Sequence, residues 1–501
     1  MNLIMKRTFY IKSIFSLVAA AGILSGCQKQ LDINHNPNFP NTDQSTPAIV
    51  FPVAVAATIG KAGADMAIVG GLWAQYYTQS AFSSQFRTVD AYNVTNTDFF
   101  TNDVFQDMYT TGLKNYQFVQ QKAQASGDWN FYLAATVMKA YTAAFLVDLY
   151  DSIPYSQSLL GKGNLNPKFD DGYAVYTSVI KSIDSALGKD FTATTNTVLG
   201  DPDLVFAGDM DQWKAFANTL KLKLYLRMVN KHADVAQAGI QALFSSNASF
   251  LTSDAAVTNF SNAPGQDNPF FDWNQRTLNT TSNLRASKTF TSWLVANSDP
   301  RVEFYFGSAT PIFQNQGDYA GSDPTYKNAA TFVQTPTDPV ELISGAESYF
   351  LQAEAVVRFG VAGNAKTLYE SGVKAAFDAL GLDGSSFVAP GGAYEWGNEV
   401  EDGQPLTPIA QIIRQKWAHF PYGCHQAEGW FDKNRTGFPA TSDVYSTDAS
   451  YVPGQLVISP NSVLPAGALP KRFVYPYNET SRNSSAPQQV VPLYTPVWWG
   501  K

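Results

Sequence analysis

Carboxylates are the most abundant side chains in this sequence that could catalyse a reaction. The chain of 501 residues carries 42 Asp and Glu residues. Pairs such as Asp148 with Asp151, or Glu399 with Glu401, could be nominated as the two acids of a glycosidase. That reaction requires a defined separation between the carboxylates. Because so many acids form pairs by chance and their separation depends on the fold, the acids alone do not predict an enzyme.

Motifs for metals and nucleophiles give no stronger case for catalysis. The histidines are scattered, without an H-E-x-x-H motif, and the nearest group is His419 with Cys424 and His425. This group lacks the spacing of a zinc site, and we interpret it as structural or exposed at the surface. No G-x-S-x-G elbow, Walker loop or Rossmann fingerprint opens a helix. We therefore predict no catalytic residue, no metal ligand and no cofactor, and nothing argues for a structural cation such as calcium.

Aromatic side chains interleaved with polar ones indicate a different function, the binding of a ligand. Sugars present flat C–H faces edged by hydroxyl groups, so their sites combine aromatic rings with polar hydrogen-bonding groups on loops. Residues 73–92 have this composition. The candidates there are Trp73, Tyr76, Tyr77, Phe86 and Arg87. Because the first three have helical spacing, they could equally belong to the core, and both interpretations stay open.

A second stretch, residues 267–279, reads DNPFFDWNQRTLN and has no helical period. Its candidate ligand contacts are Phe270, Phe271, Trp273 and Asn274. A large aromatic side chain in such a segment must either pack back onto the protein or face a ligand. Trp396, in a loop rich in glycine and acids, is a third and weaker candidate.

The N-terminus carries the features of an export signal. Basic residues precede an apolar run from Ile14 to Leu24. Such a helix covers only about 16 Å, roughly half of the hydrocarbon core of a membrane. The run ends in Leu24-Ser25-Gly26-Cys27, which looks like a lipobox. We predict that residues 1–26 are removed and that Cys27 is acylated; an ordinary signal peptide with a chance cysteine is the alternative.

The mature chain is acidic and has one cysteine beyond this anchor. Without residues 1–26, 31 basic residues face 42 acidic ones, a formal net charge of −11. An acidic exported protein has no electrostatic footprint for nucleic acid. Cys424 has no disulfide partner if Cys27 is acylated, so burial must hold the fold. Residues 27–47 are polar and contain prolines, which predicts a flexible tether, and residues 48–501 are expected to form a single domain.

Helical periodicity dominates from Ala48 onward. The clearest helix pair covers residues 345–381, where Glu354 can pair with Arg358 one turn later and Asn364 can cap the second helix. Similar pairs are expected at 131–147 with 172–188 and at 211–230 with 234–246. Long loops separate these pairs. We predict a mainly all-α fold in which tetratricopeptide-like helical hairpins form a scaffold for long irregular loops, with few short strands.

A series of short motifs runs in order along nearly the whole mature chain. They are Leu31 to Asn34 with Asn36-Pro37-Asn38, Asp148 to Tyr155, Asp299-Pro300-Arg301, Ala353-Glu354-Ala355 with Arg358, Ile412 to Trp417 with Trp430, Arg435 to Pro439, Pro470 to Phe473 with Tyr475-Pro476 and Glu479, and Val497-Trp498-Trp499. In order and spacing this series resembles the SusD/RagB family. The sequence departs from the family at Asp151 and Ser152, where Gly and Asp are common, and at Asn434, where an arginine is usual.

The resemblance implies a single helical domain that is anchored by lipid to the outer membrane and exposed at the cell surface. It also implies a partner, a SusC-like TonB-dependent transporter, above which such proteins capture nutrient, commonly oligosaccharide and sometimes peptide. Neither enzyme activity nor nucleic-acid binding is expected. The protein is expected to contact the membrane only through the lipid on Cys27. Two alternatives stay open: a peptide-binding protein of this family, and a tetratricopeptide-like adaptor that recognises only protein.

Overall fold

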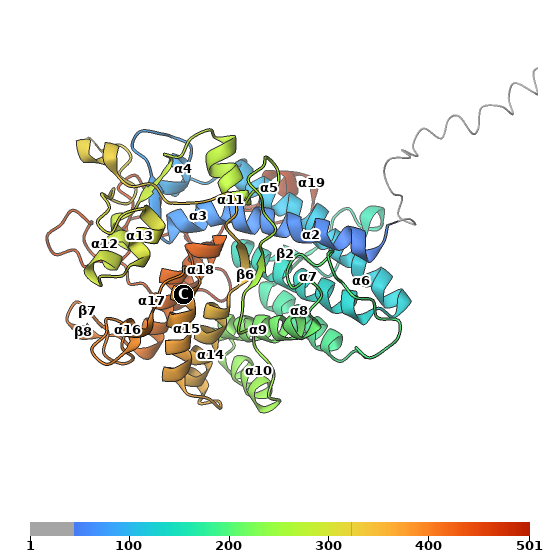
Figure 1. Ribbon diagram of the computed structural model, residues 1–501. Coiled ribbons are helices and arrows are strands. Elements are labelled where there is room, and N and C mark those ends of the chain that lie inside the picture. The colour runs from blue at the N-terminus through green and yellow to red at the C-terminus, as the bar shows by residue number, and fades with distance from the viewer. Residues whose placement is uncertain (1–44, 322) are drawn as a thin grey trace, which may run out of the picture. The chain divides into compact units, whose positions relative to one another are not determined.

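Helical hairpins form most of this structure, a computed structural model that describes residues 45–321 and 323–501. Pro47 to Lys501 form one compact unit, in which helices dominate over short strands (Figure 1). The prediction of a mainly helical fold with few strands is confirmed. The signal segment, Cys27 and the tether as far as residue 44 lie outside the described residues.

Long helices supply the scaffold, and short ones lie in the loops between them. The α-helices are α2 (Pro47–Gly60), α3 (Met66–Trp73), α4 (Arg87–Asp90), α5 (Phe99–Asp107), α6 (Lys114–Ser126), α7 (Trp129–Tyr150), α8 (Gly172–Leu187), α9 (Met210–Met228), α10 (Ala233–Ser245), α11 (Pro269–Phe271), α12 (Lys288–Ala296), α13 (Arg301–Phe306), α14 (Gly345–Phe359), α15 (Ala365–Asp378), α16 (Ser385–Val388), α17 (Pro408–His419), α18 (Ala427–Thr436) and α19 (Tyr477–Arg482). The π-helical turns are η1 (Lys61–Asp65), η2 (Met108–Leu113) and η4 (Asp272–Thr277), and the 3₁₀ turns are η3 (Gly161–Gly163), η5 (Pro324–Asn328) and η6 (Tyr422–Cys424). Because η1 and η2 join their neighbours without a break, residues 47–73 and 99–126 each form one long helix.

Each described sheet is a pair of short antiparallel strands that pins a loop to the helical body. The pairs are β1 (Tyr77–Gln79) with β5 (Leu284–Ala286), β2 (Ile153–Pro154) with β3 (Phe169–Asp170), β4 (Ala255–Val257) with β6 (Val340–Ile343), and β7 (Val400–Glu401) with β8 (Gln404–Pro405). The register of β1 and β5 places Thr78 opposite Arg285. The pairings of β1 with β5 and of β4 with β6 join segments far apart in sequence, which alternation within a single segment cannot predict.

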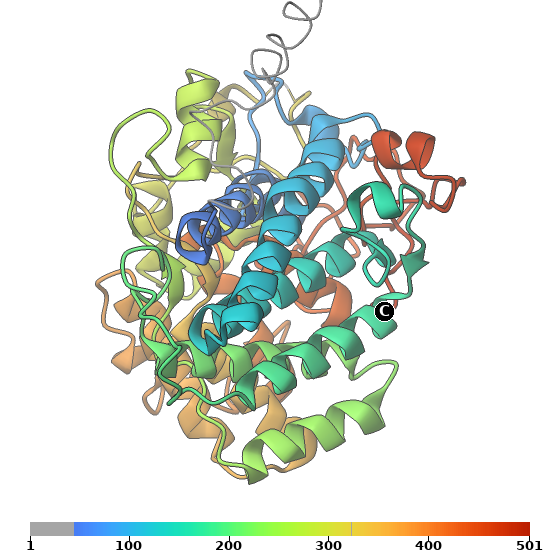
Figure 2. The same ribbon diagram turned by 90° about the vertical axis from the view of Figure 1, so that its right-hand side faces the viewer.

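The predicted helix pairs are all present. Helix α7 packs against both α6 and α8, α9 packs against α10, and α14 packs against α15. Figure 2 shows the continuous helix α5–η2–α6 crossing the molecule beside α2, with α8, α9 and α10 below it. The antiparallel arrangement follows from short connections between amphipathic helices, each of which must bury one apolar face.

The pair α14–α15 shows how the sequence specifies close packing. The side chain of Asn364 caps α15 by accepting a hydrogen bond of 3.0 Å from the backbone N–H of Thr367. Gly372 on α15 faces Phe350 on α14 so closely that an added Cβ would lie 2.7 Å from the ring. Because glycine has no side chain at this position, the two helices can approach, as the small residues in the sequence predicted.

A buried ion network joins four scaffold helices. Its members come from α9 (Lys223, Arg227), α14 (Glu347, Glu354), α17 (Lys416) and α18 (Glu428, Asp432, Arg435). The ammonium of Lys416 lies 2.7 Å from a carboxylate oxygen of Asp432, and that of Lys223 lies 2.8 Å from Glu428. Desolvating such charges is costly unless each has an opposite partner, so the network requires the four helices to keep one mutual arrangement.

Two helical stretches are long and apolar enough to cross a membrane by length and composition alone, Pro47–Trp73 and Trp129–Tyr150. The apolar window of the second is 89 % buried within the structure. Helix α2 in the first packs against α6, and α3 packs against α18. A core helix of a globular protein passes the same test, and these contacts are those of core helices.

Candidate ligand-binding surfaces

Five of the aromatic residues predicted as ligand contacts lie inside the hydrophobic core. They are Trp73, Tyr76, Tyr77, Phe86 and Phe270, each no more than 2 % exposed. The ring centroid of Trp73 lies 4.7 Å from that of Trp430, and that of Tyr76 lies 5.1 Å from that of Phe290. Side chains buried in this way have no surface left for a ligand, so the core interpretation of the helical stripe is correct and these five are withdrawn as contacts.

Arg87 is partly exposed and holds the loop that follows β1. Its guanidinium donates hydrogen bonds to the backbone oxygens of Ser83 and Ala81 at 3.0 and 3.2 Å. The same group lies 5.2 Å from the ring centroid of Tyr319. Two of its donors serve the backbone and its plane contacts a tyrosine, so Arg87 positions two loops against each other.

The aromatic shelf, formed by Phe99, Phe271 and Trp273, is the part of the predicted site that stays at the surface. Phe99 begins α5 and is 41 % exposed, and its ring meets that of Trp273 edge-on with centroids 5.3 Å apart. Phe271 and Trp273 are half-buried. The contact joins the start of α5 to η4, and Phe99 was not among the predicted contacts because it lies beyond residues 73–92.

Local sequence explains how the shelf is held. The buried side chain of Asn268 caps α11, accepting hydrogen bonds of 2.9 and 3.0 Å from the backbone N–H groups of Phe270 and Phe271. Pro269 follows at the first helical position, which suits its fixed φ. With Phe270 anchored in the core, the residue after it must point outward. Asn274, also predicted as a contact, is buried in η4 and is withdrawn for that reason.

An open pocket of about 560 Å³ lies beside the shelf. It is lined by Phe271, Gln275, Arg276, Asn279, Thr280 and Thr281. The guanidinium of Arg276 lies 5.5 Å from the ring centroid of Phe271, and it donates hydrogen bonds to the carboxylate of Asp267 and, at 3.0 Å, to Asn262. An aromatic ring next to amide, hydroxyl and guanidinium groups is the combination that a pyranose ring requires.

Trp396 does not join this pocket. Its ring packs against Tyr369, with centroids 5.0 Å apart, in the segment between α16 and β7. Figure 1 shows α16 and β7 well away from α11. Trp396 therefore belongs to a different face of the structure from the aromatic shelf.

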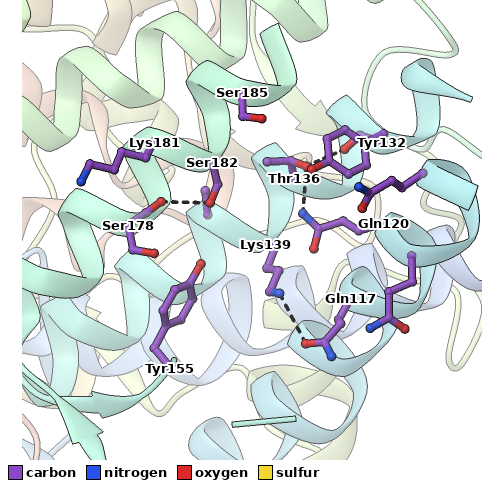
Figure 3. A pocket seen from close by; sticks show the side chains of 13 residues that line it. Gln117, Gln120, Tyr132, Thr136, Lys139, Tyr155, Ser178, Lys181, Ser182 and Ser185 are labelled. Carbon is purple, nitrogen blue, oxygen red and sulfur yellow. Dashed lines mark hydrogen bonds between the residues drawn. The ribbon is translucent and has the colours of Figure 1, made fainter. Parts of the chain in front are cut away.

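A groove between α6, α7 and α8 went unnoticed in the sequence. It has a volume of about 500 Å³ and is lined by Gln117, Gln120, Gln121, Gln124, Tyr132, Thr136, Lys139, Ala140, Tyr155, Ser178, Lys181, Ser182 and Ser185 (Figure 3). Gln120 donates a 2.8 Å hydrogen bond to the hydroxyl of Thr136 across the groove. Burial lowers the pKa of Lys139 to about 8. The glutamines recur along one face of α6, a signal that resembles an ordinary solvated helix face and so conceals the groove.

Two further pockets lie among the described residues. One pocket of about 560 Å³ lies between α5, η2 and α19 and includes Phe105, Tyr109 and Leu165. Another of about 400 Å³ contains Lys433 and Lys471 beside Asn434. In the second pocket, burial lowers the pKa of Lys433 to about 7.

The acids once considered for catalysis serve the fold. Asp148 accepts a 2.7 Å hydrogen bond from the indole N–H of Trp499, and Asp151 accepts one of 2.6 Å from the backbone N–H of Trp498. The other pair, Glu399 and Glu401, lies against Arg414, at 3.8 and 2.6 Å. The first pair ties the C-terminal segment to α7, and the second ties β7 to α17.

Comparisons with known proteins address the fold and the family together. The profile of the SusD-like family, described as starch-binding and associating with the outer membrane, matches residues 46–460. Among the curated proteins, none is similar enough in sequence to count as a match.

Solved structures with this fold come from several bacteria. A SusD homologue from Bacteroides uniformis is 21 % identical, with a TM-score of 0.71 over 90 % of this chain and 99 % of that one. A SusD/RagB family protein from Bacteroides thetaiotaomicron is 20 % identical, with a TM-score of 0.70 over 91 % of this chain and 100 % of that one. A chitin-binding SusD homologue from Flavobacterium johnsoniae is 20 % identical, with a TM-score of 0.70 over 90 % and 98 % of the two chains. At these identities the likeness shows a common fold.

Proposed function

This chain belongs to the SusD-like family, and from that premise we propose that it is a cell-surface lipoprotein that captures oligosaccharide and delivers it to a SusC-like TonB-dependent transporter. The family description supplies association with the outer membrane and binding of starch. The lipobox ending at Cys27 supplies a means of attachment, since several acyl chains hold a protein on a bilayer without a spanning helix.

The observation that supports a glycan site is the pocket beside the aromatic shelf. Phe271 presents a partly exposed ring to it, and Gln275, Arg276 and Asn279 provide hydrogen-bonding groups around that ring. Trp273 and Phe99 extend the apolar surface next to it. Stacking on rings and hydrogen bonding to amides suit a neutral sugar polymer, and both starch, named for the family, and chitin, named for one compared structure, consist of pyranose rings.

Replacement of Trp273 by alanine tests the shelf directly. We expect calorimetry with malto-oligosaccharides and chito-oligosaccharides to show one class bound by the unmodified protein. The variant W273A should then lose on the order of 1–3 kcal/mol of binding free energy, because truncation removes a ring that supports the platform. The matched comparison is W396A, a tryptophan on another face, which should leave the affinity unchanged. Normal affinity in W273A together with weakened binding in W396A would contradict the proposed position of the site.

A peptide ligand is the alternative within the same family. An aromatic pocket in an acidic protein also suits an extended peptide with basic side chains, so the same calorimeter run should compare peptides with glycans. Peptide binding that is sensitive to W273A would keep the site and change the ligand. No enzyme activity is proposed, and a reducing-end assay with starch and chitin should show no release of sugar above a protein-free control.

The groove of Figure 3 favours a second function, a protein adaptor. Glutamines of α6, serines of α8, and Thr136 and Lys139 of α7 form a concave polar surface of the kind that holds an extended polypeptide. An adaptor without a nutrient ligand would bind its barrel partner and no glycan. Charge introduced by S182E should then abolish co-purification with the partner, whereas W273A should have no effect on it.

A further inference from the structure

Three buried side chains from separate segments converge beneath β6. They are Glu341 on β6, His419 at the end of α17, and His425 just after η6. They are 2 %, 1 % and 5 % exposed. One potential ligand atom from each lies within 4.8 Å of the other two. None of the three residues belongs to the aromatic shelf or lines the pocket beside it, and none has a part in the proposed capture of glycan.

Glu341 differs from the other buried acids of the described residues in having no cation and no hydrogen-bond donor. Each of the others either lies within 4 Å of a lysine or arginine nitrogen or accepts a hydrogen bond. They are Asp65, Asp90, Asp128, Asp148, Asp203, Asp267, Asp299, Glu347, Glu354, Glu399, Glu428 and Asp432. Both carboxylate oxygens of Glu341 are buried without a hydrogen-bond partner. An uncompensated buried carboxylate costs several kcal/mol, so a compensating group is expected here.

The two imidazoles are the groups nearest to this carboxylate. The Nε2 atom of His425 lies 3.2 Å from Oε2 of Glu341, but the two are not aligned for a hydrogen bond, and both ring nitrogens of His425 are buried without a partner. The Nε2 atom of His419 lies 3.7 Å from the same oxygen. It also lies 2.8 Å from the hydroxyl of Ser344, while its Nδ1 is buried and unpartnered.

The surrounding backbone encloses the carboxylate tightly. Gly423 has a φ of +70°, and a Cβ added there would lie 2.4 Å from the carboxylate carbon of Glu341. Phe420 packs edge-on against His425, with centroids 4.8 Å apart, and gives the cluster an apolar wall. Convergent donors inside an apolar shell, with a glycine that leaves room for the carboxylate, are the features of a structural metal site.

We propose that Glu341, His419 and His425 bind a divalent transition-metal cation of the zinc type, which pins the segment between α17 and α18 to β6. Imidazole nitrogen and carboxylate oxygen are ligands that zinc accepts, at about 2.0–2.2 Å. Ligand atoms on one tetrahedral ion lie about 3.4 Å apart, so a pair as far apart as 4.8 Å must close by more than about 1 Å when the ion binds. The cation would supply the positive charge that Glu341 lacks and would bind one of the two unpartnered nitrogens of His425.

The competing state is a neutral cluster of a protonated acid and two imidazoles. Burial raises the pKa of Glu341 and lowers that of His425, which permits that state at neutral pH. The two states differ in metal content and in their response to chelator, so they can be separated by experiment without reference to glycan binding.

Metal analysis of the full chain, purified in detergent after growth with zinc, tests the proposal. We expect about one zinc per chain, and a Co²⁺-substituted protein with visible bands of imidazole coordination. The variants H425Q and E341Q should retain less than about a tenth of that zinc. The control H232Q changes a histidine that stacks on Tyr173 and should keep it. Chelator should lower the melting temperature of the unmodified protein by several degrees.

Two results would overturn the proposal. One is unmodified protein that binds less than about a tenth of an equivalent of zinc after incubation with excess metal, gives no cobalt spectrum and melts unchanged in chelator. The other is folded H425Q that keeps its zinc. If that variant does not fold, the cobalt spectrum and chelator response of the unmodified protein decide the matter alone.

Discussion

Glu354 illustrates how a single side chain can couple stability to pH. It pairs with Arg358 at 2.7 Å and with Arg435 at 2.8 Å, and it is fully buried. Burial would raise its pKa, but the guanidiniums of Arg435 and Arg358 outweigh that effect and lower the pKa to about 2. A carboxyl with a lowered folded-state pKa contributes stability above its unfolded pKa, and this stability is lost as pH falls toward the folded value.

The variant E354Q should therefore be destabilised most at neutral pH. From the lowered pKa, the expected loss in the free energy of unfolding is about 3 kcal/mol at pH 7. The difference from the unmodified protein should narrow as pH falls from about 4.5 toward 2. Urea unfolding of both proteins at pH 7 and at pH 3.5 measures this difference in the free energy of unfolding. Glu370, which pairs with Lys366 at the surface of α15 at 3.7 Å, gives the control E370Q, expected to lose less than about 1 kcal/mol. Equal losses of unfolding free energy in E354Q and E370Q would contradict the larger contribution expected from the buried carboxylate.

Single residues show which contacts the sequence could predict. The pairing of Glu354 with Arg358 follows from helical spacing and is confirmed. Arg435, 81 positions away, meets the same carboxylate only because α18 packs against α17 and α17 against α14. The same limitation concealed the partner of His419 and His425, since Glu341 approaches from a distant strand. Local spacing carries no information about such contacts.

The aspartate at position 151, where the resemblance to the SusD/RagB family leads one to expect glycine, also has a structural explanation. Its φ is +75°, a conformation that glycine favours, and the family commonly has glycine there. The carboxylate of Asp151 accepts a hydrogen bond from the backbone of Trp498, which offsets part of the backbone strain. The sequence showed the substitution, but the compensating contact with the C-terminal segment required the fold.

At the scale of elements, the contact between α3 and α18 depends on a glycine. A Cβ added at Gly70 would lie 2.4 Å from the backbone Cα of Ala427, which cannot yield as a flexible side chain could. We expect G70A to lose about 1–3 kcal/mol of stability, the usual cost of overpacking. Gly60, at the end of α2, has helical dihedrals and open space around it. The control G60A should gain about 0.4–1 kcal/mol by restricting the unfolded chain.

Denaturant unfolding of both variants distinguishes packing from helix propensity. If propensity dominated, G70A and G60A would both be stabilised, and the close approach of α3 to α18 would not be the reason for the glycine. If both variants lost stability, the joined helix α2–η1–α3 would be unable to accept alanine at either position.

Helix pairs were predictable because their periodicity lies within one segment. The capping of α15 by Asn364 is confirmed at the residue that suggested it, whereas the contact of Gly372 with Phe350 is seen only in the fold. The segment of α11 and η4 was expected to be irregular, and instead forms a short capped helix followed by a π turn. A turn of this length has too few residues to show a period, so only its Asn-Pro start could have indicated it.

For the whole molecule, the order of motifs predicted the fold, while the surfaces for ligands required the structure. Half of the predicted ligand contacts are core aromatics, because a ring packed in the core and a ring that faces a ligand are the same residue types, and the expected helical spacing ends at Trp73, with Tyr77 on β1. The aromatic shelf arises where the start of α5 meets η4. The groove of Figure 3 arises where three helices lie side by side. The shelf and the groove each form between separate segments, so the sequence of one segment does not predict either of them.

The proposed attachment of the whole molecule to the membrane rests on acylation of Cys27, which lies outside the described residues. Acyl chains add about 0.8 kcal/mol per buried CH₂, so several chains hold the protein at the bilayer, and loss of the acceptor thiol should release it. We expect C27S to take up no labelled palmitate and to leave the membrane fraction. Its glycan affinity should match that of the anchored protein, because the aromatic shelf lies in the folded unit from Pro47 onward.

Protease added to intact cells gives the complementary measurement, since an anchored protein at the cell surface should be cleaved while a periplasmic control protein is protected. An unlabelled mature chain with an intact cysteine, or a chain that resists protease until the cells are broken, would exclude surface capture. It would do so whatever glycan the purified domain binds, because a ligand site that faces the periplasm cannot supply a transporter from outside.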